Sequence, residues 1–439
     1  MSFSSIPFLS FLASFLTLYG FCPIRYRRYL LLFSSAVFVC LGSGRSFWWI
    51  LCLTGANYFM GICISKTAYR KEATAVAVAC NIIMLTAFKL SGNLPIGISY
   101  YSFAFMSYLV DISRGQCKPE YSVVRFANFS LFFPKLLMGP ITRYSELGHQ
   151  IDRPKPRVSG LQEGLESFML GFVMKIFIAD RLAIFWNELI TIGISCLPAA
   201  LAWLGAFGFS IQLFIEWQSY TLMAVGIAGC LGYQLPQNFN YPYLARSIGD
   251  FYRRWHITLG RWFKDYVYIP LGGSRQGTQR TVLNLLIVWL LTSLWHGLGW
   301  NYLFWGMSLG LFIVVEKLWL GPVLAEHKTL SHLWVLFLIP LTWVCFKIEN
   351  IADLGVYFSR LFPFFGGEDV VGMNIFWRVL KKYAIYLTLG VLFCFPLPEK
   401  LVHRYGKTWI ISILLAVLFW WAVYTLYRFG SNPMMYLNY

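Results

Sequence analysis

The chain has 439 residues, of which 58% are hydrophobic and only 13% are charged, so it is far more apolar than the core of a soluble protein of this length requires. This composition excludes an ordinary soluble domain and indicates a polytopic membrane protein. The net charge of +17 would suggest a nucleic-acid partner in a soluble protein. Here the basic residues gather in short loops between apolar runs, as the positive-inside rule describes, so we expect membrane lipids and no nucleic acid.

The first three apolar runs agree with that rule. Residues 6–21 lead to a basic cluster at Arg25–Arg28, and runs 29–42 and 47–64 lead to a second basic loop at 66–71. The first run has neither a basic region before it nor a convincing cleavage site after it, so we expect a retained helix. The N-terminus is then predicted to lie outside, with both basic loops in the cytoplasm.

The middle of the chain breaks the simple alternation. After runs 73–90 and 96–110, the run 126–141 is interrupted by Pro134 and Pro140, which favours a re-entrant segment over a span. Three further runs then place residues 246–280 outside, although this segment has seven basic residues. Either one run does not span or residues 236–272 are themselves re-entrant. The three runs are 161–186, 197–215 and 220–235.

Five more apolar runs complete the pattern, which gives roughly eleven spanning helices and one or two re-entrant pieces. We see no repeat or low-complexity linker, so the chain is predicted to be a single all-α integral-membrane domain, residues 1–439. The ten cysteines form no C-x-x-C pair and no Cys/His cluster, so no metal site is predicted. The five runs are 282–298, 302–315, 333–346, 383–395 and 409–427.

His296 lies within an apolar stretch that has no formal charge from Thr281 to Val315. A titratable imidazole at membrane depth usually lines a cavity, pairs with another polar group or takes part in chemistry. The alternative is a neutral histidine bonded to a neighbouring helix, with the flanking tryptophans serving only in packing. We therefore treat His296 as a candidate site residue.

A second candidate region runs from Gln237 to Arg275 and combines basic, acidic and aromatic residues. Residues 245–265 are predicted to form a helix, capped by Ser247, that brings Asp250 and Arg254 onto one face. Four basic residues of this region either bind a phosphorylated acyl carrier or simply anchor the loop. Asp265 is expected to pair with a cation, and His256 is either a site residue or a structural one. Leu271–Arg275 is predicted to be a turn. The four basic residues are Arg253, Arg254, Arg261 and Lys264.

Several motifs resemble the membrane-bound O-acyltransferase family, in particular its bacterial branch related to alginate O-acetyltransferase. They occur in order within two core stretches, residues 94–144 and 212–306, and in the C-terminal Asn432–Tyr439. The chain departs from the family at 214–222, where Glu216 replaces one aspartate and Leu222 replaces another, in keeping with a divergent acceptor or a weaker enzyme. The motifs are Leu94-Pro-Ile-Gly-Ile-Ser-Tyr-Tyr-Ser-Phe103, Gly139-Pro-Ile-Thr-Arg-Tyr144, Asn238-Phe-Asn-Tyr-Pro-Tyr243, Asp250-Phe-Tyr-Arg-Arg-Trp-His256, Asp265-Tyr-Val-Tyr-Ile-Pro-Leu-Gly-Gly273 and Leu294-Trp-His-Gly297.

The resemblance implies a helical bundle with a central tunnel in the bacterial inner membrane. It implies that His296 is catalytic, that His256 is the second site histidine, and that the segment from Asp250 to Asp265 shapes the cytoplasmic entrance. The residues expected to bind the acyl donor or line the tunnel are Trp295, Asn238, Arg253, Arg254 and Asp265.

The implied activity is transfer of acetyl groups from cytoplasmic acetyl-coenzyme A, a substrate rather than a bound cofactor, to hydroxyls of a cell-envelope polysaccharide. Alginate, another exopolysaccharide and peptidoglycan are the expected acceptors, reached directly or through an extracytoplasmic partner of the SGNH acetyltransferase type. His296 would act as general base, although a covalent acyl-enzyme stays open, and the oxyanion donor could be Trp295, a glycine amide or His256. D-alanyl transfer to teichoic acid and a non-enzymatic transporter or flippase are the alternatives.

Overall fold

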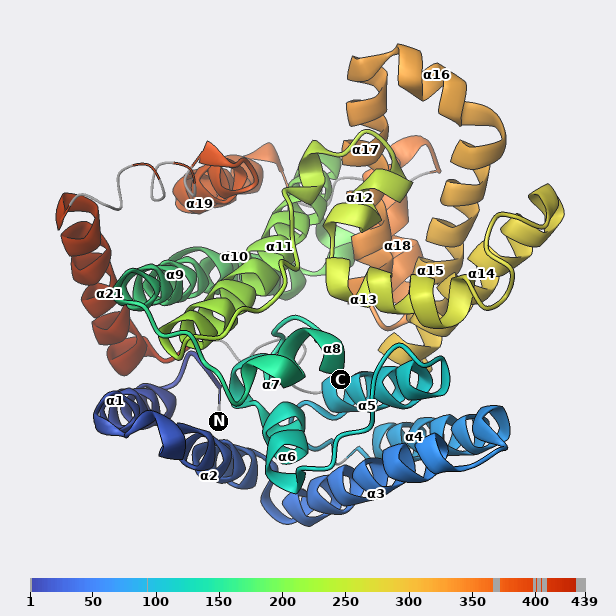
Figure 1. Ribbon diagram of the computed structural model, residues 1–439. Coiled ribbons are helices and arrows are strands. Elements are labelled where there is room, and N and C mark those ends of the chain that lie inside the picture. Colours follow the sequence, from blue (N-terminus) through green and yellow to red (C-terminus); the bar gives the residue numbers. More distant parts are fainter. Residues whose placement is uncertain are drawn as a thin grey trace. The chain divides into compact units, whose positions relative to one another are not determined.

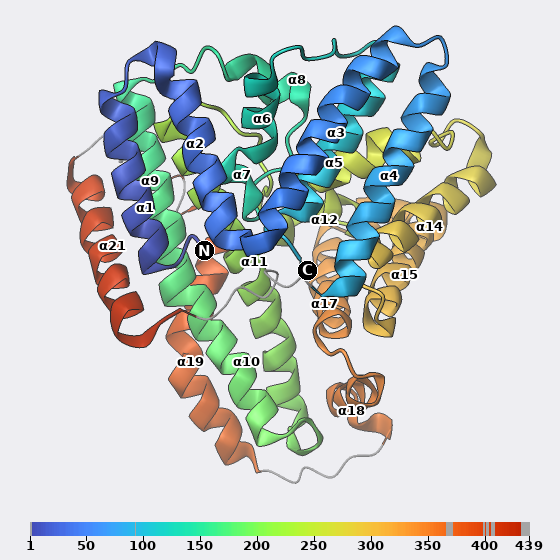
Figure 2. The ribbon, with the colours of Figure 1, turned by 90° about the horizontal axis from the view of Figure 1, so that it is seen from below.

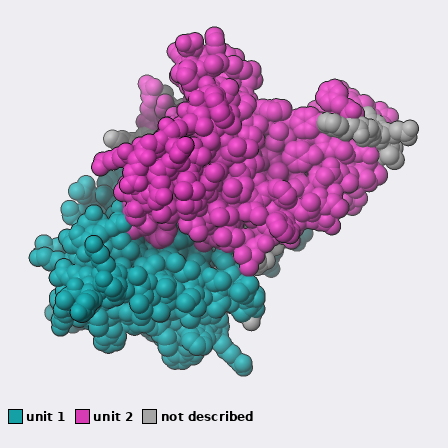
Figure 3. Space-filling view, turned by 90° about the vertical axis from the view of Figure 1, so that its right-hand side faces the viewer, with its two compact units in different colours: residues 1–172, 219–238, 415–439 teal, residues 173–218, 239–414 magenta. Residues whose placement is uncertain are grey.

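The structure is a computed structural model, described for residues 2–92, 94–365, 372–397, 400, 404 and 409–431 (Figure 1). Every regular element in these ranges is a helix, which confirms the predicted all-α class. The chain divides into two compact units (Figure 3). Unit 1 comprises residues 1–172, 219–238 and 415–439, and unit 2 comprises residues 173–218 and 239–414. The single integral-membrane domain stays a prediction, and the tail Asn432–Tyr439 lies outside the described residues.

Unit 1 contains the helices that precede the break at residue 172, together with parts of two later ones. Figure 2 shows three of them, α3, α4 and α5, side by side. Serine side chains cap the N-termini of two of these helices. Ser5 accepts a hydrogen bond from the amide of Phe8, and Ser122 accepts one from the amide of Arg125. The helices are α1 (Ile6–Phe21), α2 (Ile24–Ser43), α3 (Phe47–Lys66), α4 (Arg70–Ser91), α5 (Ile98–Ser113), α6 (Val123–Leu131), α7 (Phe133–Leu136), α8 (Tyr144–Leu147), α9 (Val158–Met174) up to residue 172, and the ends of α11 (Ala199–Cys230) and α21 (Trp409–Phe429).

Polar side-chain contacts join helices of unit 1. Asn57 of α3 and Asn81 of α4 exchange amide hydrogen bonds of 3.2 and 2.8 Å, an arrangement that stabilises helix pairs in lipid. A second network centres on Asp152, which accepts from Arg28 at 3.1 Å and also from Arg125. Arg125 in turn binds Glu120 at 2.9 Å. These contacts fix the loop after α8 to α2 and α6.

The run predicted to be re-entrant is broken and buried. α6 and α7 are short, and Met138 between α7 and α8 has a positive φ of 56°, which is uncommon for a residue other than glycine. All residues from 128 to 142 are buried. Irregular backbone at membrane depth is tolerated where protein covers it, so the segment has the predicted form. Its entry and exit on one membrane side stay a prediction.

Unit 2 contains the remaining helices and three π-helical turns. Its helices are α10 (Asp180–Ile192), the first part of α11, α12 (Ile248–Arg254), α13 (Ile257–Phe263), α14 (Gly277–His296), α15 (Trp300–Val315), α16 (Gly321–Glu326), α17 (Lys328–Lys347), α18 (Ile351–Leu361), α19 (Met373–Phe393) and the start of α21. The π-turns in the described residues are η3 (Lys175–Ala179), η6 (Lys264–Tyr268) and η7 (Glu316–Leu320).

α11 corrects the prediction of two separate runs at 197–215 and 220–235. It is one continuous helix of 32 residues, from Ala199 to Cys230. The intervening Glu216–Ser219 contains no proline or glycine, and Lys175 binds the Glu216 carboxylate at 2.9 Å. Because the charge is paired, the polar interruption costs the helix little. One predicted crossing is therefore removed from the middle of the chain.

The predicted helix 245–265 is also corrected. It is divided into α12 and α13 at His256, which has φ 46° and so lies in the left-handed region that an α-helix cannot include. Two of its predicted details are confirmed: Ser247 caps α12, and Arg254 binds Asp250 at 3.1 Å. The predicted turn at 271–275 is confirmed as well, with positive φ at Gly272 and Gly273.

Six helices in the described residues are long and apolar enough to cross a membrane. This identifies a multi-pass membrane protein, while the larger count of about eleven spans and the central tunnel stay predictions. No element was predicted at α18 (Ile351–Leu361). This amphipathic helix is capped by Asn350, whose side chain accepts from the amide of Ala352 at 2.8 Å.

Candidate active site

His296 is the last residue of α14, where the amide of Gly297 closes the helix on the carbonyl of Ser293. The imidazole is buried and surrounded by aromatic rings, with centroid distances of 4.9 Å to Trp305 and 5.1 Å to Phe346, both nearly perpendicular to it. Trp295 also contacts it at 4.5 Å. α15 and α17 therefore supply an apolar wall for the predicted catalytic histidine.

Close packing of α14 on α15 produces this wall. A Cβ at Gly306 would lie 1.9 Å from Oγ of Ser293, so the two helices approach at a distance that only glycine allows. Trp305 directly precedes this glycine and is carried against His296. A larger residue at position 306 would have to separate the helices that enclose the imidazole.

His256 lies at the junction of α12 and α13, and it is 4% exposed. Its ring contacts Trp217 at 5.0 Å and Phe239 at 6.3 Å. Neither ring nitrogen has a hydrogen-bond partner among the described residues, although both are buried. Burial lowers the pKa of His256 to about 3, so the ring is neutral at physiological pH. Unpaired buried polar atoms are rare and point to a bound water or ligand.

A continuous set of rings, here called the aromatic cluster, connects the two histidines within unit 2. From His296 the contacts run through Trp305 to Trp343 at 5.8 Å, and from Trp343 to Trp255 at 5.0 Å. Trp255 directly precedes His256. Both histidines thus share one desolvated environment, in which electrostatic interactions are stronger than in water. The cluster consists of Trp217, Phe239, Trp255, Trp305, Trp343 and Phe346.

The other predicted site residues occupy different surroundings. Asn238 is fully buried and directly precedes Phe239 of the cluster. Arg254 is one-third exposed and Arg253 is 72% exposed, and both bind Asp250. Asp265 is half-buried in η6. The structure therefore brings His296, Trp295 and His256 to the aromatic cluster, whereas Arg253 extends toward solvent.

Sequence reasoning missed a buried charge cluster in the same unit. Nζ of Lys175 lies 2.5 Å from Asp180 and 2.9 Å from Glu216, and all three side chains are less than one-tenth exposed. Glu216 directly precedes Trp217, which contacts His256. The signal was a lysine within the apolar run 161–186, since buried ionisable residues in membrane proteins need partners.

Comparison with known proteins identifies the chemistry. The model of the membrane-bound O-acyltransferase family matches residues 106–340. The chain belongs to this family. It is 35% identical to the probable alginate O-acetylase of Pseudomonas fluorescens, over 83% of this chain and 76% of that protein. It is 30% identical to the peptidoglycan O-acetyltransferase of Helicobacter pylori, over 68% of this chain and 66% of that protein.

A third relative in the family is less similar. The teichoic acid D-alanyltransferase of Bacillus subtilis is 28% identical, over 48% of this chain and 56% of that protein. The matched residues 106–340 include both histidines and most of the aromatic cluster. The protein is thus an O-acyltransferase, which transfers an acyl group to a hydroxyl.

Proposed function

We propose that this O-acyltransferase moves acetyl groups from cytoplasmic acetyl-coenzyme A across the bacterial inner membrane to hydroxyls of a cell-envelope polysaccharide. The observation that carries the proposal is the similarity to an alginate O-acetylase over 83% of the chain. The similarity to a peptidoglycan O-acetyltransferase also supports transfer of acetyl groups to an envelope polymer. Transfer proceeds directly or through an extracytoplasmic acetyltransferase of the SGNH type.

In the proposed reaction His296 is the general base. An acceptor hydroxyl gives its proton to the imidazole as its oxygen attacks the thioester carbonyl. The carbon–sulfur bond then breaks, and the coenzyme A thiolate takes the proton back from His296. A hydroxyl is a weak nucleophile at neutral pH, so a positioned histidine accelerates this step. The rings around His296 exclude water, which limits hydrolysis of the thioester.

His256 has a different role in the proposal. Its two unpaired ring nitrogens can bind the substrate, and one of them can donate a hydrogen bond to the developing oxyanion. The low pKa keeps the ring neutral, so it can donate through one nitrogen while the other accepts. Asn238 and Trp295 are proposed to line the path of the acyl group beside these histidines.

The basic residues of α12 are proposed to attract the phosphates of the donor. Arg253 is exposed, and Arg254 presents its guanidinium beside Asp250. With α11 counted as one crossing, the positive-inside rule puts residues 246–280 on the cytoplasmic side. α14 then runs outward to His296, in keeping with about eleven spans and a tunnel between the two membrane faces.

The test replaces His296 by alanine in native membranes and measures transfer of labelled acetyl from acetyl-coenzyme A to the envelope polysaccharide. Loss of the general base is expected to lower the rate by about 10²–10⁴-fold. His327→Ala is the matched control, since His327 is exposed at the start of α17. Undiminished transfer in His296→Ala, at equal protein level, would contradict the assignment.

D-alanyl transfer is the second candidate, and it rests on the more distant relative. The same membranes supplied with a D-alanyl carrier protein and teichoic acid distinguish the two. Labelled D-alanine on teichoic acid, with no acetyl ester on polysaccharide, would favour the second candidate.

A further inference from the structure

Glu316 is a buried carboxylate without a cationic partner among the described residues. It begins η7, the π-turn that continues α15, and it is 6% exposed. Its oxygens accept three hydrogen bonds, all from neutral N–H groups: Ile248 at 2.6 Å, Gly249 at 3.1 Å and the indole of Trp334 at 2.8 Å. A buried charge requires such compensation, because desolvation without hydrogen bonds is costly.

Two of the three donors are the first amides of α12. The first amides of a helix have no partner within the helix, and the positive end of the helix dipole favours an anion there. The next amide, that of Asp250, is bound by Ser247 within the same segment. Glu316 is therefore the distant group, 68 residues away in sequence from Ile248, that fixes where α12 begins.

α12 ends at the site. Its seven residues are followed by Trp255 of the aromatic cluster and then by His256. The amide of Trp255 closes the helix on the carbonyl of Phe251, and His256 follows in the left-handed conformation. An α-helix rises about 1.5 Å per residue, so a displacement at Ile248 is carried along a rigid rod of about 10 Å, which ends two residues before His256.

A second contact restrains the same segment from α17. Nδ1 of His332 lies 3.1 Å from the carbonyl oxygen of Ala245, just before α12. Trp334 of the same helix donates to Glu316. α15 and α17 also supply the rings that enclose His296. The helices that surround one histidine thus hold the start of the segment that bears the other.

We propose that Glu316 is a positioning residue for acyl transfer, which sets the place of His256 through α12. This inference rests on the proposed role of His256. In this proposal Glu316 acts through His256 and not on the substrate. A shift of about 1 Å in a reacting group can lower a rate by about 10²-fold, so loss of the anchor acts on the rate rather than on the amount of folded protein.

The test uses the full chain in native membranes, with the chromosomal copy altered and labelled acetyl-coenzyme A as the probe. Glu316→Ala is expected to lower kcat for polysaccharide acetylation by about 10–100-fold, with a smaller change in KM for the donor. Glu316→Asp should restore part of the loss, since it keeps an acceptor for the amides. Glu326→Ala is the control, an exposed glutamate ten residues further along the chain.

A double variant separates positioning from general stability. If Glu316 acts through His256, Glu316→Ala lowers the rate little further in a His256→Asn background. Equal fold losses in both backgrounds would overturn the proposal and indicate a purely structural carboxylate. Full activity of His256→Asn alone would instead contradict the proposed function of His256, so the two failures are distinguishable.

Discussion

His256 combines a backbone conformation and a side-chain environment that are both unusual. A positive φ of 46° is uncommon outside glycine, asparagine and aspartate, and histidine is among the residues that adopt it more often than most. Strain of this kind persists where the surroundings enforce it, typically at functional sites. Because asparagine also tolerates the left-handed region, a His256→Asn variant removes the imidazole while preserving the chain path.

His256→Asn is expected to abolish most acetyl transfer and to make the fold less sensitive to acid. The folded pKa of about 3 lies below the unfolded value of about 6.5. Below pH 6.5 the unfolded state therefore binds the extra proton, and stability falls as the pH drops toward 3. Each pH unit in this window shifts the folding equilibrium about tenfold.

The measurement is thermal unfolding in detergent at pH 7.5 and pH 5. From pH 7.5 to pH 5, the protonation of His256 alone should lower the folding equilibrium constant of the wild type roughly 30-fold. The variant should not show this decrease. His327→Asn, at an exposed position, should respond to acid as wild type does. An identical acid response of His256→Asn and wild type would contradict the buried neutral imidazole.

At the scale of elements, glycines decide how closely helices of unit 1 pack. A Cβ at Gly164 of α9 would lie 2.6 Å from the carbonyl oxygen of Gly226, and one at Gly226 would lie 2.5 Å from that of Gly164. The two backbones thus touch where both residues lack side chains, the usual way in which membrane helices associate. One turn earlier, a Cβ at Gly160 would have its nearest neighbour at 3.8 Å.

Gly164→Ala is expected to destabilise the protein by about 1–3 kcal/mol, since backbone atoms cannot yield as a flexible side chain can. Gly160→Ala is the matched control on the same helix and should be near neutral. The measurement is the fraction of protein that stays monodisperse in detergent after heating. If the two variants melt at the same temperature, the close contact between Gly164 and Gly226 does not contribute to stability as expected.

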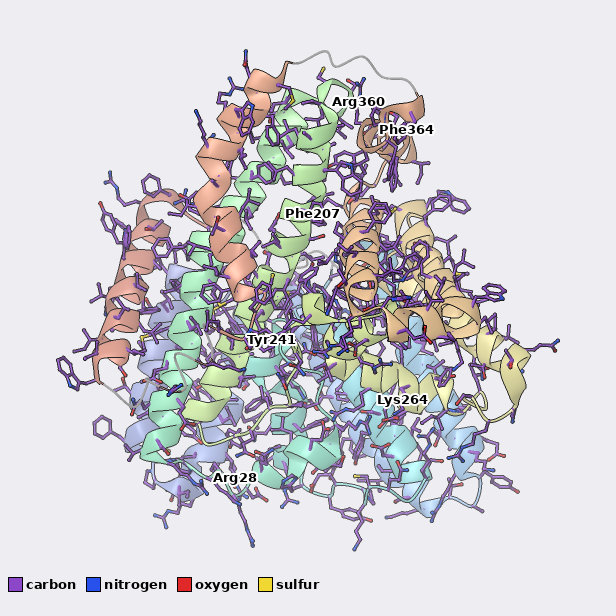
Figure 4. All side chains as sticks on the ribbon, turned by 90° about the horizontal axis from the view of Figure 1, so that it is seen from above. Arg28, Phe207, Tyr241, Lys264, Arg360 and Phe364 are labelled. Atoms are coloured by element: carbon purple, nitrogen blue, oxygen red, sulfur yellow. The ribbon has the colours of Figure 1, made fainter. Side chains whose placement is uncertain are left out.

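At the scale of the whole chain, α11 resolves a conflict in the charge pattern. Two separate runs at 197–215 and 220–235 would place seven basic residues outside, whereas with one helix the positive-inside rule predicts them on the cytoplasmic side. Within unit 2, Figure 4 labels Arg360 and Phe364 at one end and Lys264 far from them.

Cysteine labelling tests that orientation. Arg275→Cys should react with a membrane-impermeant thiol reagent only in inverted vesicles, and Glu349→Cys only in intact cells, because both positions are exposed and are predicted to lie on opposite sides. Labelling of the unmodified protein measures the reaction of its native cysteines, and this background is subtracted. Labelling of both variants from the same side would contradict the assigned topology.

Much of the fold was predictable, because apolar runs and basic loops reflect the membrane directly. The predicted segments at 6–21, 47–64 and 409–427 correspond to helices with nearby ends. The errors came where tertiary pairing overrides local signals. Lys175 neutralises Glu216 within α11, and the left-handed His256 divides a sequence that reads as one helix.

The candidate site was predictable in part. His296 and His256 stand out as histidines in motifs, and the structure brings both to one aromatic cluster. Trp217 and Trp343 were not predicted, since a ring contact between distant helices leaves no local pattern. Glu316 was missed for the same reason, because its partners are backbone amides, which every sequence contains.

The π-turn η3 changes which residues of α9 and α10 share one side of the helix. In a regular α-helix, residues five apart such as Lys175 and Asp180 would point about 140° away from each other. The i→i+5 hydrogen bond of a π-turn aligns them instead, which permits their 2.5 Å contact. One extra residue thus rotates everything that follows. Loss of a single codon here would turn α10 by about 100° and move its buried side, which includes Leu182 and Phe185, out of the protein interior.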